Sequence, residues 1–339
     1  MSIHEIAKRA GVSIATVSYA LNNKKKISKE KKELILRIAE EMNYVPNSLA
    51  KGLLAKRTSI IGLIVPDISM PYTLAIIRHM EHYARQNDLF LLLGHTNGQM
   101  STMRSIVDSF ISKNVDGMIL ATGLGAADHK EMIKIVSRIQ KYKVPNIIIS
   151  PMQPVTAPSM NYVVPDLEEG EYQITRYLLS QDIKRLVFIG GQDSDYVAAI
   201  RRNGFRRALA DYKLPAPAEL FCDCGYQFQD GYQAILRLLD SGREVPKGIV
   251  AINDSVAFGI FKGLRERHLR VPEDVSLVGY DDIELPTLDF IPLTTVKIPV
   301  EEICRLSIEG LMKCREGIDM TFQYSLKPQV IFRESVLAQ

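Results

Sequence analysis

The pattern of hydrophobic residues changes near residue 60, because only the part that follows contains short continuous apolar runs. From Ile60 onward, short apolar runs alternate with amphipathic stretches at helical spacing. The runs predict strands at Ile60–Val65, Leu89–Gly94, Gly117–Ala121, Asn146–Ile149, Arg185–Gly190, Glu219–Cys222, Gly248–Ile252 and Val275–Gly279. The stretches predict helices at Leu74–Gln86, Ile106–Lys113, Glu131–Tyr142, Glu168–Leu179 and Ala198–Ala210, and a later pair of segments predicts helix Val300–Arg315 and strand Gln329–Arg333. Apolar strands separated by helices indicate parallel sheets covered on both faces. Because the strands form two series, we expect an α/β body of two doubly wound lobes with a ligand cleft between them.

Residues 2–43 instead predict three short helices and no strand. Gly11 ends the first helix, Ser13 caps the second and Ser28 caps the third. The residues expected to face a common core are Ile3, Ile6, Ala7, Ala10, Val17, Ala20, Leu21, Leu34, Ile38, Ala39 and Met42. A helix, a turn containing glycine and a second helix is the arrangement that places the second helix in the major groove of DNA. Three helices alone are also typical of any small bundle.

A short segment joins this head to the body. Pro46 disfavours helix at Val45, and Asn47 is a good cap for a new helix from Ser48 to about Ala55. A helix of this length is marginal in isolation. We therefore interpret residues 46–57 as a hinge.

Charge is distributed unevenly along the chain. Residues 1–57 carry 12 Lys and Arg against 5 Asp and Glu, whereas the other residues carry 30 against 34. A head of net charge +7 on a body of net charge −4 is typical of a protein whose head alone contacts a polyanion, although a merely soluble surface would also account for it.

Several classes of protein are disfavoured by the sequence. The first residues offer no apolar signal-peptide core, and no apolar run is long enough for a membrane span. The four cysteines form neither a disulfide framework nor a zinc pattern, so we expect no metal and no cofactor. Neither glycine pair, Gly190-Gly191 or Gly123-x-Gly125, completes a dinucleotide motif. We therefore expect no catalytic residue and no enzymatic activity. We also expect the protein to be located in the cytoplasm.

One string in the head carries a family resemblance. Ile6-Ala7-Lys8-Arg9-Ala10-Gly11-Val12-Ser13, followed by Thr16-Val17-Ser18 and Leu21-Asn22, resembles the lactose-repressor (LacI/GalR) family of bacterial transcription regulators, as do Tyr44-Val45-Pro46-Asn47 and Ala50-Lys51-x-Leu53. The resemblance implies that DNA is contacted by Ser13, Ile14, Ala15, Thr16, Ser18, Tyr19, Asn22, Asn47, Ala50, Lys51, Leu53 and Leu54. Ile14, Ala15 and Tyr19 would occupy base-reading positions, where the two apolar residues suit thymine methyl groups.

The resemblance also gives the hinge a role. It implies that the hinge folds on DNA beside its twin from a second subunit, with Leu53 inserted between base pairs in the minor groove. The alternative is that Leu53 packs on the body. Since the chain ends at Gln339 without a leucine heptad tail, we expect a homodimer.

The body resembles the same family and its periplasmic sugar-binding relatives. The residues that carry this are Ile64-Val65-Pro66-Asp67, Asp116-Gly117, Pro165-Asp166 with Gly170, Arg201-x-x-Gly204-Phe205, Asn253-Asp254 and Gly279-Tyr280-Asp281-Asp282. Matched position by position, the implied effector-binding residues are Tyr72, Asp166, Arg201, Asn253 and Asp281. Their hydroxyl, carboxylate, amide and guanidinium groups suit a sugar or related polyol.

Alternatives remain for individual residues and for the ligand. Arg201 could pair with Asp195 on a helix surface, and Asp281 could cap a turn. Met70, Ser150-Pro151 and Ile298 depart from the usual sugar-binding pattern, which leaves a nucleobase, a modified sugar or a phosphorylated metabolite open.

These features predict a sequence-specific transcription regulator, a dimeric repressor that binds operator DNA of the bacterial nucleoid and is switched by a small ligand. The predicted domains are residues 1–45 (helix-turn-helix), 46–57 (hinge) and 58–339 (effector binding and dimerisation). Within the body, we expect a first lobe of about 58–160 and 293–322 and a second lobe of about 161–292 and 323–339. A solute-binding receptor without catalytic activity and a corepressor-dependent regulator are the alternatives.

Overall fold

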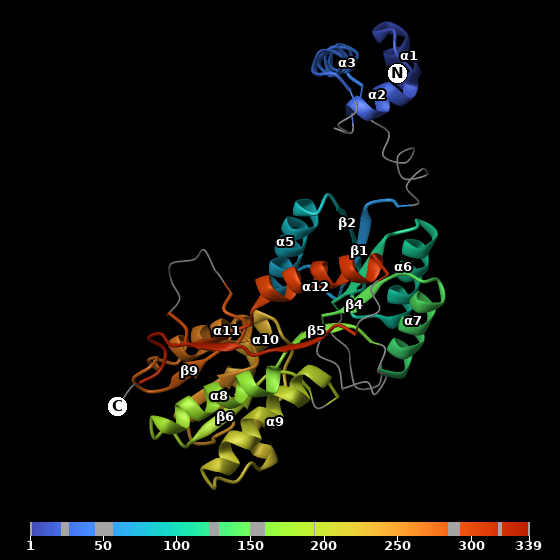
Figure 1. Cartoon of the computed structure of the whole chain (residues 1–339). Coiled ribbons are helices and arrows are strands. Elements are labelled where there is room, and N and C mark those ends of the chain that lie inside the picture. The colour runs from blue at the N-terminus through green and yellow to red at the C-terminus, as the bar shows by residue number, and fades with distance from the viewer. Residues whose placement is uncertain are drawn as a thin grey trace. The chain divides into compact units, whose positions relative to one another are not determined.

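The computed structural model describes residues 2–21, 27–44, 57–121, 129–149, 160–192, 194–283, 292–317 and 321–337. It forms two compact units, Met1–Thr58 and Ser59–Gln339. The first unit is helical and the second is an α/β body (Figure 1).

Three helices form the head: α1 (Ile3–Ala10), α2 (Ile14–Leu21) and α3 (Lys29–Glu41). Gly11 takes a left-handed conformation, with φ of 63°, and so ends α1 as predicted. The Ser13 Oγ accepts the Thr16 amide at 3.2 Å, which confirms the cap of α2. Ser28 occupies the cap position of α3 but makes no side-chain capping hydrogen bond.

The core of the head differs from the prediction at one residue. The buried side chains are Ile6, Ala7, Val17, Ala20, Ile35, Ile38 and Ala39. Leu34, which we expected inside, is 42% exposed. Ile35 replaces it because positions 35, 38 and 39 share one helical face, whereas position 34 lies about 100° away from 35.

The first lobe of the body contains a six-stranded parallel sheet. Its order is β11-β5-β4-β3-β1-β2. The strands are β1 (Ile60–Val65), β2 (Phe90–His95), β3 (Gly117–Leu120), β4 (Asn146–Ile148), β5 (Tyr162–Pro165) and β11 (Gln323–Leu326). The helices of this lobe are α5 (Pro71–Gln86), α6 (Met100–Ser112), α7 (His129–Lys141) and α12 (Val300–Arg315).

Both faces of this sheet are covered, as the continuous apolar strands predict. On β1, Ile61, Leu63 and Val65 belong to the core shared with α5 and α12. Ile64 belongs to the core shared with α6 and α7. Gly62 allows close approach on that side, since a Cβ atom there would lie 2.2 Å from the ring of Phe110.

The second lobe has a four-stranded parallel sheet of order β7-β6-β8-β9. Its strands are β6 (Leu186–Ile189), β7 (Phe221–Cys222), β8 (Gly248–Ala251) and β9 (Ser276–Val278). Its helices are α8 (Leu167–Ser180), α9 (Tyr196–Asp211), α10 (Phe228–Asp240) and α11 (Asp254–Glu266), with a short 3-10 helix at Ala218–Leu220. Helix α8 packs on α9, and α10 packs on α11.

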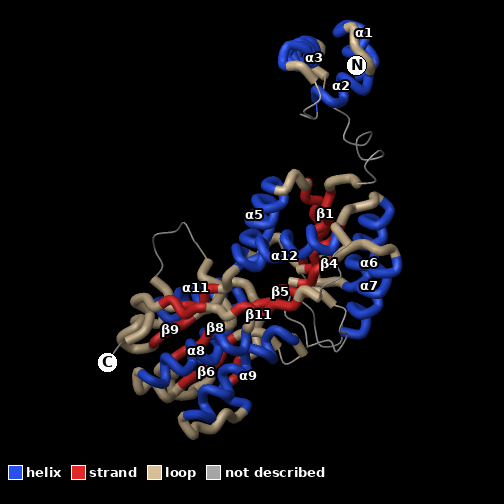
Figure 2. Tube along the Cα trace, in the orientation of Figure 1, coloured by secondary structure: helices blue, strands red, loops and turns tan. Residues whose placement is uncertain are grey.

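The chain crosses between the lobes a few residues away from the predicted boundaries. Strands β5 and β11 extend the first sheet (Figure 2), so Tyr162–Pro165 and Gln323–Leu326 lie in the first lobe and not in the second lobe predicted from the sequence. Strand β10 (Thr295–Lys297) pairs with β12 (Gln329–Ile331) and bridges to the end of β9, so it belongs with the second lobe. Strands β5, β10 and β11 have only three or four residues each, and no apolar run predicted them.

Candidate functional site

The predicted base-reading positions lie on the exposed side of α2. Ile14 and Tyr19 are 41% and 42% exposed, and Ala15 is exposed beside them. The opposite side of the helix buries Val17 and Ala20 in the core of the head. Ile14, Ala15 and Tyr19 therefore face away from the core of the head.

The start of α2 carries the polar positions of the same surface. Ser13 is exposed, Thr16 and Ser18 are half-buried, and the Ser13 and Thr16 hydroxyls lie 2.8 Å apart. Asn22, Asn47, Ala50, Lys51, Leu53 and Leu54 lie outside the described residues. A helix start with an exposed serine hydroxyl suits contacts with DNA phosphates.

A cavity of about 580 Å³ lies between the two lobes of the body. Its walls are the segments that follow the strands: Pro66 after β1, Ala121 after β3, Ile149 after β4, Tyr226 after β7, Asn253 after β8 and Asp281 after β9. A cleft at the carboxyl ends of parallel strands is what the two strand series predicted. Four of the five predicted effector residues line it, namely Tyr72, Arg201, Asn253 and Asp281.

Arg201 and Asp281 form the charged centre of the cleft. The Arg201 Nη2 lies 3.3 Å from the Asp281 Oδ1, and the two side chains are 6% and 10% exposed. The Arg201 guanidinium also donates to the Ile252 carbonyl and lies 3.8 Å from the centre of the Tyr280 ring. Arg201 therefore pairs with Asp281 and not with Asp195. The turn at Asp281 has a φ of 112°, a value rare for a residue with a side chain.

Burial has the largest effect on the pKa of two carboxyl groups at or near the cleft, Asp281 and Asp254. Burial raises the pKa of Asp281 to about 6, and the nearby charge of Arg201 offsets part of that rise. Burial, together with the charge of Asp281, raises the pKa of Asp254 to about 8. Asp254 does not line the cleft; it accepts the Thr295 hydroxyl at 2.6 Å and the Ile283 amide at 2.9 Å. Asp254 thereby fixes the segment that carries Asp281.

Asn253 lines the cavity and also makes hydrogen bonds that fix two segments of the cleft wall. Its side-chain oxygen accepts the Val256 amide at 2.8 Å and so caps α11. Its side-chain nitrogen donates to the Tyr226 carbonyl at 3.0 Å. An amide has two donors and an oxygen with two lone pairs, so one of each remains for a ligand.

Asp166 has a different position from the one predicted. Its carboxylate accepts the Glu169 amide at 3.0 Å and caps α8, and it does not line the cavity. Its neighbours Pro165 and Leu167 line the cavity instead. The spacing Asp166-x-x-Glu169 is typical of a helix cap and could have indicated this role.

Several lining residues were not predicted. Asp195 caps α9 through the Val197 amide and accepts the Tyr226 hydroxyl, and both residues line the cavity. Burial raises the pKa of the Tyr226 hydroxyl, and also that of Tyr72, so both stay neutral. Asp67 and Gln227 line the same cavity. The sequence signal for Asp195 and Tyr226 was only that they follow predicted strands.

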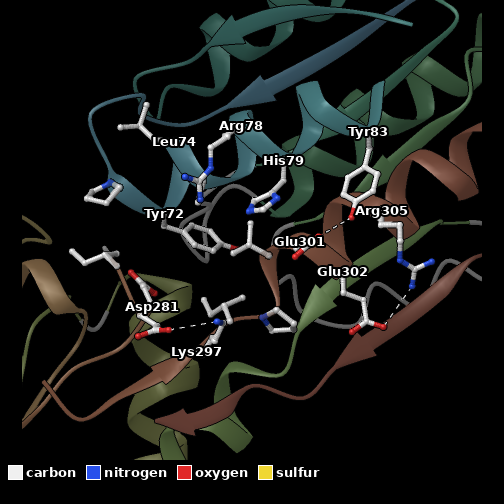
Figure 3. Close-up of a pocket in the computed structure, with 17 residues that line it drawn as sticks. Tyr72, Leu74, Arg78, His79, Tyr83, Asp281, Lys297, Glu301, Glu302 and Arg305 are labelled. Atoms are coloured by element: carbon white, nitrogen blue, oxygen red, sulfur yellow. Dashed lines mark hydrogen bonds and ion pairs between the residues drawn. The ribbon is translucent and has the colours of Figure 1, made fainter. Parts of the chain in front are cut away.

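A second hollow of about 870 Å³ adjoins the cleft (Figure 3). Tyr72, Asp281 and Ile298 line both cavities. The walls of this hollow carry ion pairs and hydrogen bonds, including Lys297 with Asp282 at 3.7 Å and the Tyr83 hydroxyl with Glu301 at 3.0 Å. Tyr72 and Asp281 are therefore accessible from both cavities.

Metal binding and membrane insertion were considered for the described residues as well. Within them, no group of three or more His, Cys, Asp or Glu side chains could hold a metal ion. No helix in the described part of the chain is long and apolar enough to cross a bilayer.

Comparison with known proteins matches both parts of the chain. Residues 2–47 match bacterial regulatory proteins of the lacI family, and residues 175–336 match the periplasmic binding protein-like domain. The HTH-type transcriptional regulator DegA of Bacillus subtilis is 32% identical over 302 residues, covering 89% of this chain and 88% of DegA. The HTH-type transcriptional repressor PurR of Haemophilus influenzae is 28% identical over 341 residues, covering 99% of this chain and 98% of PurR. The structure of the lac repressor dimer bound to operator and the anti-inducer ONPF matches 100% of this chain and 99% of its own, with a TM-score of 0.88 and 23% identity.

Proposed function

Since this chain belongs to the lacI family of bacterial regulatory proteins, we propose that its cleft binds a neutral polyhydroxyl ligand, a sugar or related polyol, which sets its affinity for operator DNA. The chain is a DNA-binding transcriptional repressor with a helix-turn-helix head and an effector-binding body. Its relatives are transcription regulators, and we propose no reaction for it.

The observation that carries this proposal is the set of groups around the cleft. Asp281, Asn253 and Arg201 offer acceptors and donors to vicinal hydroxyls, and Tyr72 and Tyr226 offer flat apolar faces. A cavity of several hundred Å³ that combines converging polar groups with apolar side chains, here including Met70, Ile76 and Ile149, is typical of a small-molecule site.

The charge of the cleft favours a ligand without phosphate. Its lining includes three carboxyl side chains, Asp67, Asp195 and Asp281, against the single guanidinium of Arg201, which is already paired. A phosphate would bring further negative charge close to these half-buried carboxyl groups, which is electrostatically unfavourable. This argues against a phosphorylated metabolite.

On the DNA side, we propose that a homodimer places α2 of each subunit in the major groove, with Ile14 and Ala15 against thymine methyl groups. Leu53 would enter the minor groove between paired hinges. The protein would act in the cytoplasm, on operators of the nucleoid.

The ligand would act by changing how the lobes close. Tyr72 belongs to the first lobe, whereas Arg201 and Asp281 belong to the second. A ligand that contacts both lobes can bias closure only if its affinity differs between the open and closed states. The chain enters the first lobe at Ser59, so closure can change the spacing of paired hinges.

A thermal-shift screen of the full chain tests the ligand class. Neutral sugars and polyols, nucleobases and sugar phosphates would be compared at the same concentrations. A ligand at 100 times its Kd stabilises the native state by about 2.7 kcal/mol, which raises Tm by several degrees. We expect a neutral polyol to give the largest rise; a rise given only by phosphorylated compounds would contradict the proposed ligand class.

A further inference from the structure

A fully buried carboxyl group lies behind the cleft, on α8. The Glu171 side chain is 0% exposed. Helices α8 and α9 are in backbone contact there: a Cβ atom at Gly204 would lie 2.3 Å from the Glu168 carbonyl and 2.9 Å from the Glu171 Cβ. Glu171 is therefore sealed between two helices with no opening to solvent.

This carboxyl group has almost no hydrogen-bonding partners. One oxygen accepts the Thr175 hydroxyl at 3.4 Å, and the other, Oε2, is buried without a partner. A carboxylate with a single weak hydrogen bond in a dry interior is several kcal/mol less stable than one in water. A neutral carboxylic acid avoids most of that cost.

The cation that acts on Glu171 makes its hydrogen bonds in the cleft. Arg201, on α9, acts electrostatically on Glu171, but its guanidinium donates to Ile252 and to Asp281 in the cleft. The Arg201 Nε is also buried without a hydrogen-bond partner. An ionised Glu171 would compete with Asp281 for this guanidinium, whereas a neutral one would not.

We propose that Glu171 carries a proton in the folded protein and is a positioning residue, whose neutral state leaves Arg201 committed to the cleft. Its protonation is a property of the fold alone. Its effect on a bound ligand rests on the function proposed above.

The surroundings of Glu171 agree with this assignment. Burial raises its pKa to about 8, and Arg201 and Thr175 offset only part of the rise. Tyr280, which follows β9, also faces it, and burial keeps the pKa of this tyrosine high. Strands β10 and β12 pack against α8 as well, but β12 carries no charge and the Lys297 ammonium of β10 lies beside Asp282.

Equilibrium unfolding of the full chain between pH 5 and 8 tests the proton, with no ligand needed. Because the folded pKa of this acid lies above its unfolded value, the native state holds the extra proton, and stability is lost as pH rises toward about 8. One such proton changes the unfolding constant about tenfold per pH unit. We expect Glu171→Gln to remove this contribution, so that its unfolding constant rises about tenfold less per pH unit than that of the wild type.

Glu168→Gln is the matched control, since Glu168 lies on the same helix but is 38% exposed and pairs with Arg207 at 2.9 Å. We expect its pH dependence to parallel the wild type. The proposal is overturned if Glu171→Gln also runs parallel to the wild type. It is equally overturned if Glu171→Gln loses stability at every pH, because Glu171 would then be ionised and paired.

A second measurement tests whether Glu171 acts on Arg201. The effect of Glu171→Gln would be measured again in Arg201→Gln and Arg201→Lys backgrounds. In the Arg201→Gln background, the pH range over which Glu171 loses its proton should move upward. In the Arg201→Lys background, most of this upward shift should be absent. If this pH range does not move in the Arg201→Gln background, Glu171 is a buried acid without influence on Arg201, and the proposed positioning role is wrong.

Discussion

Replacing Asp281 with asparagine should make the protein more stable while removing its response to ligand. The carboxylate is 10% exposed, and its pKa is raised from 3.8 to about 6 despite the neighbouring Arg201. Its ionised form is therefore unfavourable in the fold. Asparagine has nearly the same shape and is neutral at every pH.

The size of this effect follows from the pKa. An acid whose folded pKa is raised contributes its full stability below the unfolded value of 3.8 and loses it as pH rises through about 6. A rise of about two pKa units corresponds to about 3 kcal/mol, as an order of magnitude. The stability difference between Asp281→Asn and the wild type should thus grow from near zero at pH 4 to about 3 kcal/mol above pH 6.

Urea unfolding followed by far-UV circular dichroism at several pH values measures this difference. A variant less stable than the wild type at pH 8 would refute the reasoning, since it would mean that the ion pair with Arg201 outweighs the burial of Asp281. A difference that does not vary with pH would show that Asp281 is not the titrating group.

Three further outcomes are expected. Operator affinity should fall by roughly 10³ or more between 50 and 200 mM salt if about six phosphates are contacted, and a nearly flat dependence in anisotropy titrations would exclude the basic head as the DNA contact. Leu53→Ala should weaken operator binding far more than binding to random DNA in gel shifts, because a wedge helps only where the duplex kinks; equal losses would mean that Leu53 merely packs. Gly204→Ala should cost about 1–3 kcal/mol of unfolding free energy, because its Cβ would overlap the Glu168 carbonyl at 2.3 Å, and unchanged denaturant midpoints would show that α9 can shift freely.

The continuous apolar strands were the most predictable part of the fold. Ile60–Val65 was predicted with its observed bounds, and so was helix Val300–Arg315, because each has an apolar pattern of a single period. β5, β10 and β11 escaped prediction because each has three or four residues and includes polar or proline positions. These strands form because neighbouring strands, distant in sequence, pair with them, and a local sequence pattern does not contain that information.

The site was predictable where a motif fixed both the residue and the strand end. Arg201, Asn253 and Asp281 meet in one cleft because β8 and β9 end beside α9. Asp166 also follows a strand, yet its carboxylate turns back onto the start of α8. Asp195 and Tyr226 lie in loops, and which loop side chains reach the cavity depends on tertiary packing.

Operator binding with and without ligand tests the central claim most directly. The full chain would be titrated onto an operator selected with it from random DNA, in the presence and absence of the ligand found by thermal shift. The wild type should change its operator affinity by about 5- to 150-fold with ligand, and operator should change ligand affinity by the same factor. Asp281→Asn should bind operator as the wild type does without ligand and show no change with it. Asp166→Asn, the same substitution at a helix cap outside the cavity, should respond as the wild type does, since asparagine caps equally well. A ligand response that persists undiminished in Asp281→Asn would contradict the assignment of the cleft as the switch.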